Sequence, residues 1–303
     1  MSKLKLYAEF ARPFTLLPPA LGVLSGAVTA WGAGHSKAPI TWELALPVLW
    51  GTLMAAVLNA ANNAINQIYD LDIDRVNKPN RPLPSSRLTM GEAWGFTVVT
   101  FLIAWLLAWL ADPIGRHECF WIVIFTSVLC WAYSAPPLWT KRRGMLANIT
   151  IAIPRGVLLK VAGWSTAKTI MGLEPWYIGS IFGLFLLGAA STKDFADIEG
   201  DKAGGCQTLP ILYGVTRAAW MIAPFFVLPF FLIPVGVWRG VLTGNATLLM
   251  ILGPVLILYG IYTVYLLLRN PEELATTENH PSWTHMYRMM MVAQIGFALA
   301  YVF

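Results

Sequence analysis

Residues 42–74 read WELALPVLWGTLMAAVLNAANNAINQIYDLDID. The stretch begins as an apolar run that is long enough to cross a bilayer, since a hydrocarbon core about 30 Å thick needs roughly 20 apolar residues of α-helix. The same run then acquires four asparagines and ends in three aspartates. Polar groups inside a membrane are costly and usually serve a function. The stretch therefore predicts a transmembrane helix that carries a functional polar site at one end.

The composition of the whole chain agrees with a membrane environment. Of the 303 residues, 57% are hydrophobic and only 12% are charged, whereas soluble domains carry about 25% charged residues. Similar apolar runs recur along the chain, and because they are continuous rather than alternating, they favour helices over barrel strands. We expect an all-α integral membrane protein of about nine transmembrane helices, forming one domain over residues 1–303. The predicted spans cover residues 14–33, 42–66, 92–111, 118–134, 146–164, 175–192, 217–238, 246–267 and 284–303.

The basic residues predict which way the chain crosses the membrane. Nine spans place 15 of the 21 Lys and Arg residues on one side, four on the other, and Arg155 and Lys160 within a span. Because cytoplasmic loops are enriched in Lys and Arg, the side with 15 is predicted to be cytoplasmic, and it includes the N-terminus. The net charge of +5 does not indicate nucleic-acid binding, since no basic patch is interleaved with aromatic residues on a soluble domain.

A second acidic segment repeats the pattern of the first. Residues 193–201 read KDFADIEGD, and Asp197 follows Asp70 by 127 residues. In both segments another aspartate comes four residues later, and a Leu-Pro step follows about ten residues further on. The duplicated spacing predicts an internal pseudo-repeat that relates the segments 66–74 and 193–201. Both segments emerge on the predicted cytoplasmic side, so we expect them to face one another across a shared cavity mouth.

The two acidic segments together indicate a divalent metal ion. Carboxylates one helical turn apart repel by about 3 kcal/mol at an effective dielectric constant near 20, so several such pairs need a cation. Hard oxygen ligands without histidine or cysteine favour Mg²⁺ or Ca²⁺ over Zn²⁺. Basic residues beside the segments suit an anionic diphosphate held by the same metal. These basic residues are Arg75, Lys78, Arg81, Lys141, Arg142, Arg143, Lys193 and Lys202.

These motifs resemble those of the UbiA superfamily of intramembrane prenyltransferases. The first family motif, NDxxDxxxD, is matched by Asn66, Asp70 and Asp74, with Gln67 where many members have aspartate. The second motif, DxxxD with flanking acids, is matched within residues 193–201. The NQ pair and the phrase DIDRVNKP resemble homogentisate-type members, whereas NRPLPS and EGDKAGGCQTLP are similar to chlorophyll synthases and archaeal geranylgeranylglyceryl-phosphate prenyltransferases. A further stretch, YSAPPLWTKRRG, resembles a family loop near the diphosphate.

The resemblance implies nine helices around a central cavity that opens sideways to the bilayer and is lidded by the acidic loops. It implies Mg²⁺-dependent transfer of a prenyl group from an isoprenyl diphosphate, geranylgeranyl diphosphate among the candidates, to a lipophilic or aromatic acceptor. Two Mg²⁺ ions are expected, one held by Asn66, Asp70 and Asp74 and the other by Asp194, Asp197 and Asp201. The implied catalytic residues are Asp70, Asp74, Asp197 and Asp201. The implied substrate contacts are Asn66, Arg81, Tyr133, Lys141, Arg155 and Lys193.

Several points stay open at this stage. Tyr69 and Tyr133 are candidates to stabilise an allylic cation, and Lys160 either packs or serves elsewhere. The acceptor is open among a phenolic ring, a chlorophyll-like propionate, a glycerol phosphate ether and a quinone precursor. We expect a prokaryotic cell membrane, with the mouth of the site facing the cytoplasm.

The main alternative is a secondary transporter or ion carrier with an acidic cytoplasmic site, and a second is a purely structural membrane protein. Transporters usually hold their site near the membrane midplane on broken helices. In this chain the acids lie at helix ends, on one side and beside basic loops, which favours the enzyme.

Overall fold

The computed structural model describes residues 2–34 and 39–303, and every regular element within them is helical. Lys37, one of the four basic residues on the predicted non-cytoplasmic side, and His35 lie outside the described residues. The elements are α1 (Lys3–Ala11), η1 (Pro13–Thr15), α2 (Leu17–Gly32), α3 (Trp42–Tyr69), α4 (Leu71–Asn77), α5 (Met90–Leu110), α6 (Glu118–Ser134), η2 (Thr140–Arg142), α7 (Met145–Ala152), the π-helix η3 (Ile153–Leu158), α8 (Leu159–Ser165), α9 (Leu173–Ala189), η4 (Ala190–Thr192), α10 (Ile198–Ala203), α11 (Leu209–Tyr213), α12 (Val215–Ile222), η5 (Ala223–Phe226), η6 (Leu228–Phe231), α13 (Leu232–Trp238), α14 (Ala246–Leu268), α15 (Glu273–Thr276) and α16 (Pro281–Val302).

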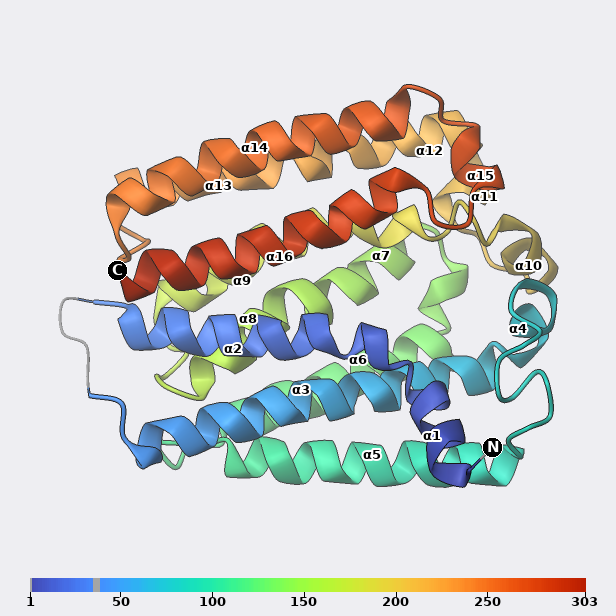
Figure 1. The fold of residues 1–303 in the computed structure, drawn as a ribbon, viewed down its shortest axis with the longest axis horizontal. Coiled ribbons are helices and arrows are strands. Elements are labelled where there is room, and N and C mark those ends of the chain that lie inside the picture. Colours follow the sequence, from blue (N-terminus) through green and yellow to red (C-terminus); the bar gives the residue numbers. More distant parts are fainter. Residues whose placement is uncertain (1, 35–38) are drawn as a thin grey trace.

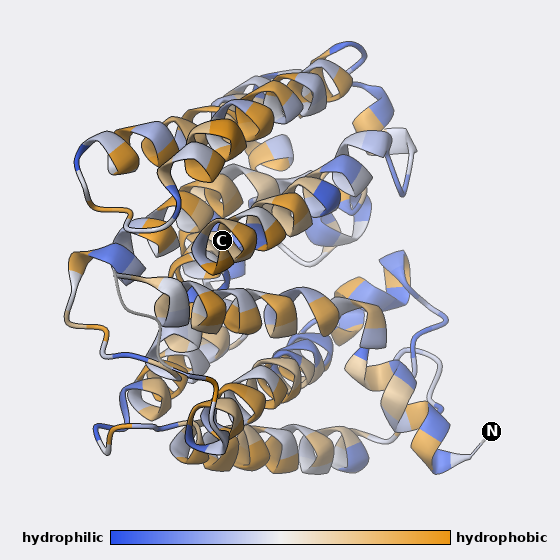
Figure 2. Cartoon of the chain, turned by 60° about the vertical axis from the view of Figure 1, so that its left-hand side comes forward, coloured by the Kyte–Doolittle hydropathy of each residue, from blue (hydrophilic) through white to orange (hydrophobic). Residues whose placement is uncertain are grey.

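The long helices run side by side, and the short helices α4, α10, α11 and α15 gather at one end of the molecule together with the N-terminus (Figure 1). The C-terminus lies at the opposite end. Hydrophobic residues run along the long helices, and hydrophilic residues collect at their ends (Figure 2). This distribution is that of an integral membrane protein with most of its charges at the two water-facing ends.

Seven helices among the described residues are long and apolar enough to cross a membrane. They are Pro13–Gly32, Trp42–Tyr69, Met90–Leu110, Met145–Ser165, Leu173–Thr192, Val215–Trp238 and Ala246–Leu268. The predicted span 118–134 corresponds to α6, an apolar helix of 17 residues. The predicted span 284–303 lies in α16, which is 22 residues long but more polar than the seven. The all-helical membrane fold is therefore confirmed, whereas the count of nine crossings and the orientation stay predictions.

Small residues let the helices approach closely at the centre of the molecule. A Cβ added to Gly163 on α8 would lie 2.2 Å from the carbonyl oxygen of Val23 on α2. A Cβ on Gly26 of α2 would in turn lie 2.6 Å from the carbonyl oxygen of Lys160. The backbones of α2 and α8 therefore touch, as small residues allow at membrane helix crossings. Apolar side chains of α2, α3, α5, α6 and α8 form one core, and those of α9, η5, η6, α14 and α16 dominate another.

Candidate active site

Both acidic segments begin where a helix breaks. Asp70, after the last residue of α3, has φ −97° and ψ 14°, and Asp197, before α10, has φ −105° and ψ 12°. A short helix starts directly after each aspartate and carries a second one, Asp74 or Asp201, as its fourth residue. The two backbones therefore repeat the same local geometry. This agreement supports the proposed pseudo-repeat, because it extends the repeat from the sequence to the chain conformation.

The two short helices are fastened to each other across the end of the bundle. Asn77, at the end of α4, donates through Nδ2 to the carbonyl oxygen of Asp197 at 3.1 Å and accepts from the Gly200 amide at 3.0 Å. A Cβ on Gly200 would lie 2.4 Å from the Asn77 side chain, and one on Gly204 would lie 2.3 Å from Ile73. These glycines are thus required by the close approach of α10 to α4, which brings the two acidic segments together.

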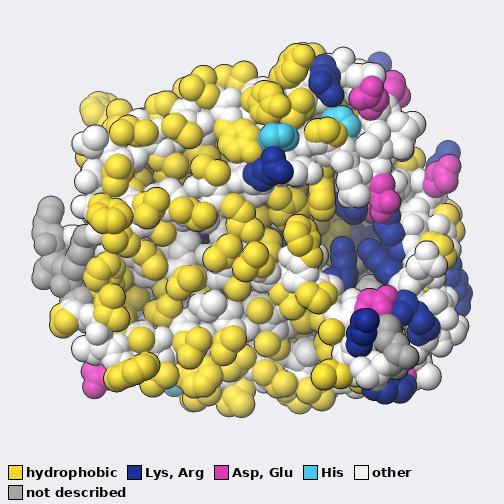
Figure 3. Space-filling view, viewed as in Figure 1, with side chains coloured by type: hydrophobic (Ala, Val, Ile, Leu, Met, Phe, Trp, Pro, Cys, Tyr) yellow, Lys and Arg dark blue, Asp and Glu magenta, His cyan; other side chains and the backbone are white. Residues whose placement is uncertain are grey.

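The two segments close one end of a cavity of ≈ 410 Å³. In Figure 3 hydrophobic side chains cover most of the visible face, and Lys and Arg side chains gather in and around a hollow at the end where α4 and α10 lie. Each of the eleven residues predicted for the site lines this cavity. They are Asn66, Asp70, Asp74, Arg81, Tyr133, Lys141, Arg155, Lys193, Asp194, Asp197 and Asp201. The structure therefore brings the predicted site together, and the chemical role of each residue stays a prediction.

Two of the carboxylates are paired with cations in the walls of the cavity. Lys141 Nζ donates to Asp70 Oδ2 at 2.5 Å, and both side chains are almost completely buried. Burial lowers the pKa of Lys141, but Asp70 and other nearby acids raise it by more, so that it lies above its usual value. Arg81 Nη1 donates to both carboxylate oxygens of Asp74 at 2.7 Å. The two cations compensate the buried carboxylates, although burial still raises the pKa of Asp74 above its usual value against the opposing charge of Arg81.

The second acidic segment is less fully neutralised. The nearest cation to Asp197 is Lys78, whose Nζ lies 3.6 Å from Oδ1. Burial and the neighbouring Asp201 carboxylate raise the pKa of Asp194 to about 7. Burial also raises the pKa of Asp201 to about 6, although Lys141 opposes this rise. This side of the mouth therefore has an unmet demand for positive charge near neutral pH.

The donor atoms suit a hard divalent cation. Asp70 Oδ1 and Asp197 Oδ1 are buried and have no hydrogen-bond partner, and the Lys78 ammonium, 3.6 Å from Asp197 Oδ1, compensates only the second of them. A cation bound at these oxygens would offset the cost of burying them. Across residues 2–34 and 39–303, no three His, Cys, Asp or Glu side chains are already arranged as a metal centre. Oxygen-only ligands fit Mg²⁺, which usually takes one or two carboxylates and completes its shell with water and substrate phosphates. The acids therefore fit Mg²⁺ best when a phosphate supplies the remaining ligands.

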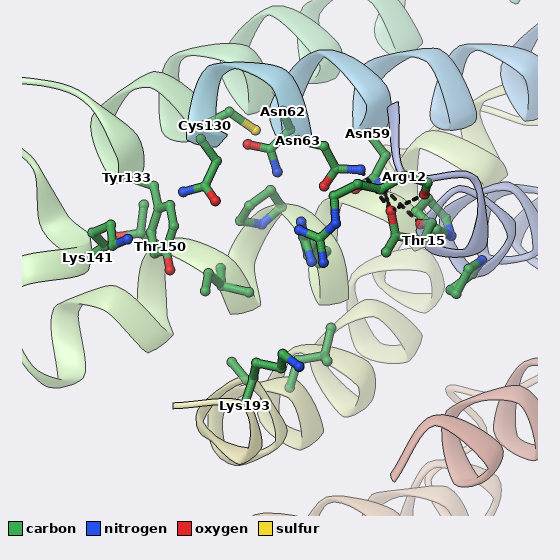
Figure 4. Close-up of a pocket in the computed structure, with 18 of the residues that line it drawn as sticks. Arg12, Thr15, Asn59, Asn62, Asn63, Cys130, Tyr133, Lys141, Thr150 and Lys193 are labelled. Atoms are coloured by element: carbon green, nitrogen blue, oxygen red, sulfur yellow. Dashed lines mark hydrogen bonds between the residues drawn. The ribbon is translucent and has the colours of Figure 1, made fainter. Parts of the chain in front are cut away.

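Arg12 is a site residue that the sequence reading missed. It lines the cavity from the connection between α1 and η1, and its backbone is left-handed with φ 59°. Figure 4 shows its side chain extending into the cavity toward Asn63, with Lys193 on the facing wall. Burial, with Arg81 and Arg155 nearby, lowers the pKa of Arg12 to about 10. A left-handed non-glycine residue is strained, and such strain is concentrated at functional sites.

The asparagine stripe of α3 has a structural role that the sequence did not reveal. Asn59 Nδ2 donates to the Thr15 carbonyl at 2.8 Å, and Asn63 Nδ2 donates to Thr15 Oγ1 at 2.7 Å (Figure 4). Gln67 Nε2 donates to the Phe10 carbonyl at 2.9 Å. The bonds to the Thr15 and Phe10 carbonyls, with a further one from Asn63 Nδ2 to the Ala11 carbonyl at 3.0 Å, pair carbonyl groups at the ends of α1 and η1. The stripe therefore holds the α1–α2 connection over the cavity, and Gln67, which stands where many UbiA-like motifs have aspartate, belongs to this support.

The structure shows what surrounds Tyr69 and Lys160, two side chains whose roles the sequence leaves open. Tyr69 is not among the residues that line the cavity, and its ring packs edge-on against Trp131 with centroids 5.8 Å apart. The ring packs between helices, so the structure gives no support to its suggested contact with an allylic cation. Lys160 Nζ donates to Ser25 Oγ at 2.7 Å and lies 4.4 Å from the centroid of the Phe182 ring. Lys160 also lies outside the cavity lining, which agrees with the packing alternative.

Comparison with known proteins places the chain among membrane prenyltransferases. Residues 16–280 match the model of the UbiA prenyltransferase family. Digeranylgeranylglyceryl phosphate synthase of Methanosphaera stadtmanae is 27% identical over 293 residues, which cover 97% of this chain and 98% of the relative. Chloroplastic homogentisate solanesyltransferase of Arabidopsis thaliana is 35% identical over 219 residues, which cover 70% of this chain and 55% of the relative.

The fold is also similar to that of solved structures. A UbiA homolog from Archaeoglobus fulgidus, solved bound to GPP and Mg²⁺, superposes with a TM-score of 0.75 at 19% identity and covers 98% of each chain. At this level of identity the similarity concerns the fold.

Proposed function

The chain belongs to the UbiA prenyltransferase family, and we propose that it uses Mg²⁺ to transfer a prenyl group from an isoprenyl diphosphate to a lipophilic acceptor. One observation carries the proposal: two acidic segments and six cationic side chains line a single cavity that continues into an apolar interior. Such a cavity suits a donor with a highly charged head and a hydrocarbon tail. The binding of GPP and Mg²⁺ by the structurally similar archaeal homolog supports the same donor class and metal.

The proposed roles follow from where each residue lies. Asn66, Asp70 and Asp74 would hold one Mg²⁺ ion, and Asp194, Asp197 and Asp201 a second. When bound, the metal would neutralise charge on the leaving diphosphate. Arg81, Lys141, Arg155 and Lys193 contact phosphate oxygens, and Arg12 joins this group. The bond between the first prenyl carbon and the diphosphate breaks, the same carbon bonds to the acceptor, and the acceptor's proton leaves toward the carboxylates at the mouth.

The walls of the cavity account for protection of the reacting carbon. Below the mouth the lining becomes apolar, with Leu58, Ile122 and Leu158 among its residues. An allylic carbon that is losing its diphosphate reacts readily with water, so a dry wall prevents hydrolysis. Tyr133 lines the same space and presents an aromatic ring, which stabilises nearby positive charge.

A side opening toward the bilayer suits the acceptor. Phe14 and Pro18 line the cavity from the α2 side, and Met286 and Met290 line it from α16. A lipophilic acceptor would thus reach the site without passing through water. The positive-inside pattern favours a cytoplasmic mouth in a prokaryotic cell membrane, where a water-soluble diphosphate leaves after transfer.

The proposal is tested by measuring diphosphate release from the detergent-purified protein with Mg²⁺ and geranylgeranyl diphosphate. The acceptors are homogentisate, 4-hydroxybenzoate, chlorophyllide and geranylgeranylglyceryl phosphate, supplied singly. Acceptor-dependent release with a prenylated product is expected, and addition of a chelator should stop it. Absence of release with every acceptor and chain length, from folded protein, would favour a secondary transporter or ion carrier instead.

A matched pair of variants connects activity to the site. Asp197→Asn removes a charge from the cavity lining. The control, Asp72→Asn, removes a charge from α4 at a side chain that is 90% exposed. We expect Asp197→Asn to reduce transfer by at least about a hundredfold, which is about 2.7 kcal/mol of transition-state stabilisation. Asp72→Asn should retain wild-type activity.

A further inference from the structure

Helix α16 turns one face to the cavity and the opposite face to the surroundings of the protein. Met286 and Met290 line the cavity. At 100° per residue, the opposite face of the helix holds Arg288, Val292 and Ile295. Arg288 is exposed, and so are Val292 and Ile295, at 38% and 54%. This outer face is therefore turned toward the acyl chains of the bilayer, and it carries an arginine.

Arg288 has no acidic partner within the part of the chain that the structure describes, since none of the ion pairs found there includes it. An unpaired arginine on a lipid-facing surface is costly unless its charge reaches the interface. Arg288 is the eighth residue of α16, about 10 Å along the helix from Pro281. Because helical side chains lean toward the N-terminus of their helix, its guanidinium extends toward the headgroup level at the mouth end of the molecule.

A histidine and two tyrosines stand beside Arg288. His285 precedes it by three residues, so the two side chains are neighbours on α16. In Figure 3 histidine and basic side chains lie next to each other among hydrophobic ones where α14 and α16 meet. The His285 ring is edge-on to Tyr262 of α14, with ring centroids 5.1 Å apart, and its Nδ1 lies 3.0 Å from the Tyr259 hydroxyl. The imidazole is thus fixed across the seam between the two helices.

The contact with Tyr259 determines what His285 can offer to a ligand. When the Tyr259 hydroxyl donates to Nδ1, the ring hydrogen of His285 sits on Nε2. This N–H, the guanidinium of Arg288 and the hydroxyl of Tyr262, a residue that is 47% exposed, are all hydrogen-bond donors. A group of donors that includes a permanent positive charge suits an anion, and a guanidinium suits phosphate in particular.

The surface that continues from Arg288 along the seam is apolar. Arg288 and Leu299 are 11 residues apart, which is about 16 Å, close to the roughly 15 Å of hydrocarbon in one leaflet of a bilayer. A Cβ on Gly296 would lie 2.3 Å from the Leu252 side chain, so the helices are in close contact and the seam is shallow. Exposed apolar residues line it on both helices: Val292, Ile295 and Leu299 on α16, and Ile251, Val255 and Leu258 on α14. The seam therefore fits an acyl chain that lies along it.

We propose that Arg288, His285 and Tyr262 form a binding site for the headgroup of an anionic phospholipid, whose acyl chain lies along the seam between α14 and α16. The ligand comes from the bilayer, because the donors are surrounded by exposed apolar side chains. A headgroup with a net negative charge is favoured over a zwitterionic one, since no acid of the described chain pairs with Arg288 and could receive the lipid's own cation. The site lies on the outer face of α16 and does not depend on the proposed function.

The test measures lipid binding to the detergent-purified full chain by native mass spectrometry. Dioleoylphosphatidylglycerol and dioleoylphosphatidylcholine are titrated separately, and the Kd of the first bound molecule is determined for each. We expect the wild type to bind the phosphatidylglycerol at least about tenfold more tightly than the phosphatidylcholine. Arg288→Gln should weaken phosphatidylglycerol binding by at least about tenfold and abolish the preference. His285→Phe keeps a ring against Tyr262 but loses Nε2, so it should weaken this binding by about threefold.

Arg239→Gln is the matched control, because it removes the same charge from another exposed arginine. Arg239 follows α13, and its guanidinium lies 4.8 Å from the ring centroid of Trp238, which is 78% exposed. The control should change the affinity for phosphatidylglycerol by less than about twofold. An equal loss in Arg239→Gln, or equal affinity of the wild type for the two lipids, would overturn the proposal, since exposed arginines would then attract lipid by charge alone.

Two further measurements keep the test decisive. Tyr262→Phe removes only a hydroxyl, so it gives a second result if Arg288→Gln unfolds: phosphatidylglycerol binding should weaken by about threefold, and unchanged affinity contradicts the site. Glycerol 3-phosphate, which lacks the acyl chains, should not displace the bound lipid at equal concentration, and displacement would indicate a site for free phosphate instead. A dimer that Arg288→Gln dissociates without changing lipid affinity would show that a second copy covers this face, and would also overturn the proposal.

Discussion

Replacing Lys141 by methionine removes the cation that is paired with Asp70. The two side chains are 9% and 7% exposed, and the ammonium lies 2.5 Å from the carboxylate. Removal of one partner from a buried ion pair costs about 3 to 5 kcal/mol, because the other charge is left uncompensated. Since the cavity admits some water, we take the lower end, about 3 kcal/mol in the free energy of unfolding.

The measurement is the apparent Tm of the Mg²⁺-free protein in detergent. A loss of about 3 kcal/mol corresponds to a fall of roughly 5 °C for a chain of this size. Mg²⁺ should restore part of this loss in Lys141→Met, since a divalent cation at Asp70 replaces the missing positive charge. Lys202→Met, at an exposed position of α10, provides a control that should leave Tm within about 1 °C of wild type.

The pairing itself is tested by a double variant. Adding Asp70→Asn to Lys141→Met removes the uncompensated charge, so the double variant should be more stable than Lys141→Met alone. The reasoning is refuted if Lys141→Met costs less than about 1 kcal/mol, or if the double variant is no more stable than the single one.

Three further results are expected. The raised pKa values of Asp194 and Asp201 are about 7 and 6, so near neutral pH the folded protein binds protons that the unfolded chain has released. Without metal, the Tm should therefore fall as pH rises from about 4 to 8. The Asp194→Asn and Asp201→Asn variants should flatten this slope in thermal scans, and a slope that persists in both contradicts the prediction. Gln67→Leu should lower the free energy of unfolding by about 1 to 3 kcal/mol. The Mg²⁺ affinity, measured by calorimetry, should stay unchanged because Gln67 does not line the cavity, and a large change in that affinity contradicts the prediction. Gly200→Ala should reduce transfer by at least about tenfold, because its Cβ would lie 2.4 Å from the Asn77 side chain. Gly91→Ala, whose Cβ would meet nothing within 4 Å, should leave transfer unchanged. Equal activity of the two variants would contradict the role of the contact between α4 and α10.

The features that the sequence predicts well are local ones. The apolar run from Trp42 predicts α3, and the aspartates at its end mark the break, since run length and charge are visible within one segment. The predicted span 217–238 is confirmed as part of Val215–Trp238, which is long and apolar enough to cross a membrane, but the structure breaks it into α12, η5, η6 and α13, a subdivision that the prediction did not include. Pro224, Pro229 and Pro234 each remove an amide hydrogen, and they are the signal that predicts these breaks.

The features that the sequence does not predict depend on contacts between distant segments. Arg12 and Asp74 are far apart along the chain, and only the fold places both in one cavity wall. The sequence shows Asn63 only as a member of the polar stripe on α3, and its bond to Thr15 arises from the way α1 and α2 cross α3. A polar residue on the inner face of a membrane helix serves either catalysis or the satisfaction of a neighbouring backbone, and the choice depends on where that helix's neighbours end.

Charge balance in the cavity predicts that metal and donor bind cooperatively. The lining contains six cations, Arg12, Lys78, Arg81, Lys141, Arg155 and Lys193, and five carboxyl groups, Asp70, Asp74, Asp194, Asp197 and Asp201. Two Mg²⁺ ions alone would leave a large excess of positive charge in a region of low dielectric constant, whereas a diphosphate carrying about three negative charges offsets most of it. Calorimetric titration of Mg²⁺ should therefore show an affinity at least about tenfold higher with an isoprenyl diphosphate present than without it, and donor affinity should rise by the same factor with Mg²⁺. Equal Mg²⁺ affinity in both titrations would mean that the cavity cations do not share the diphosphate with the metal, and would remove Arg12, Arg155 and Lys193 from the proposed donor contacts.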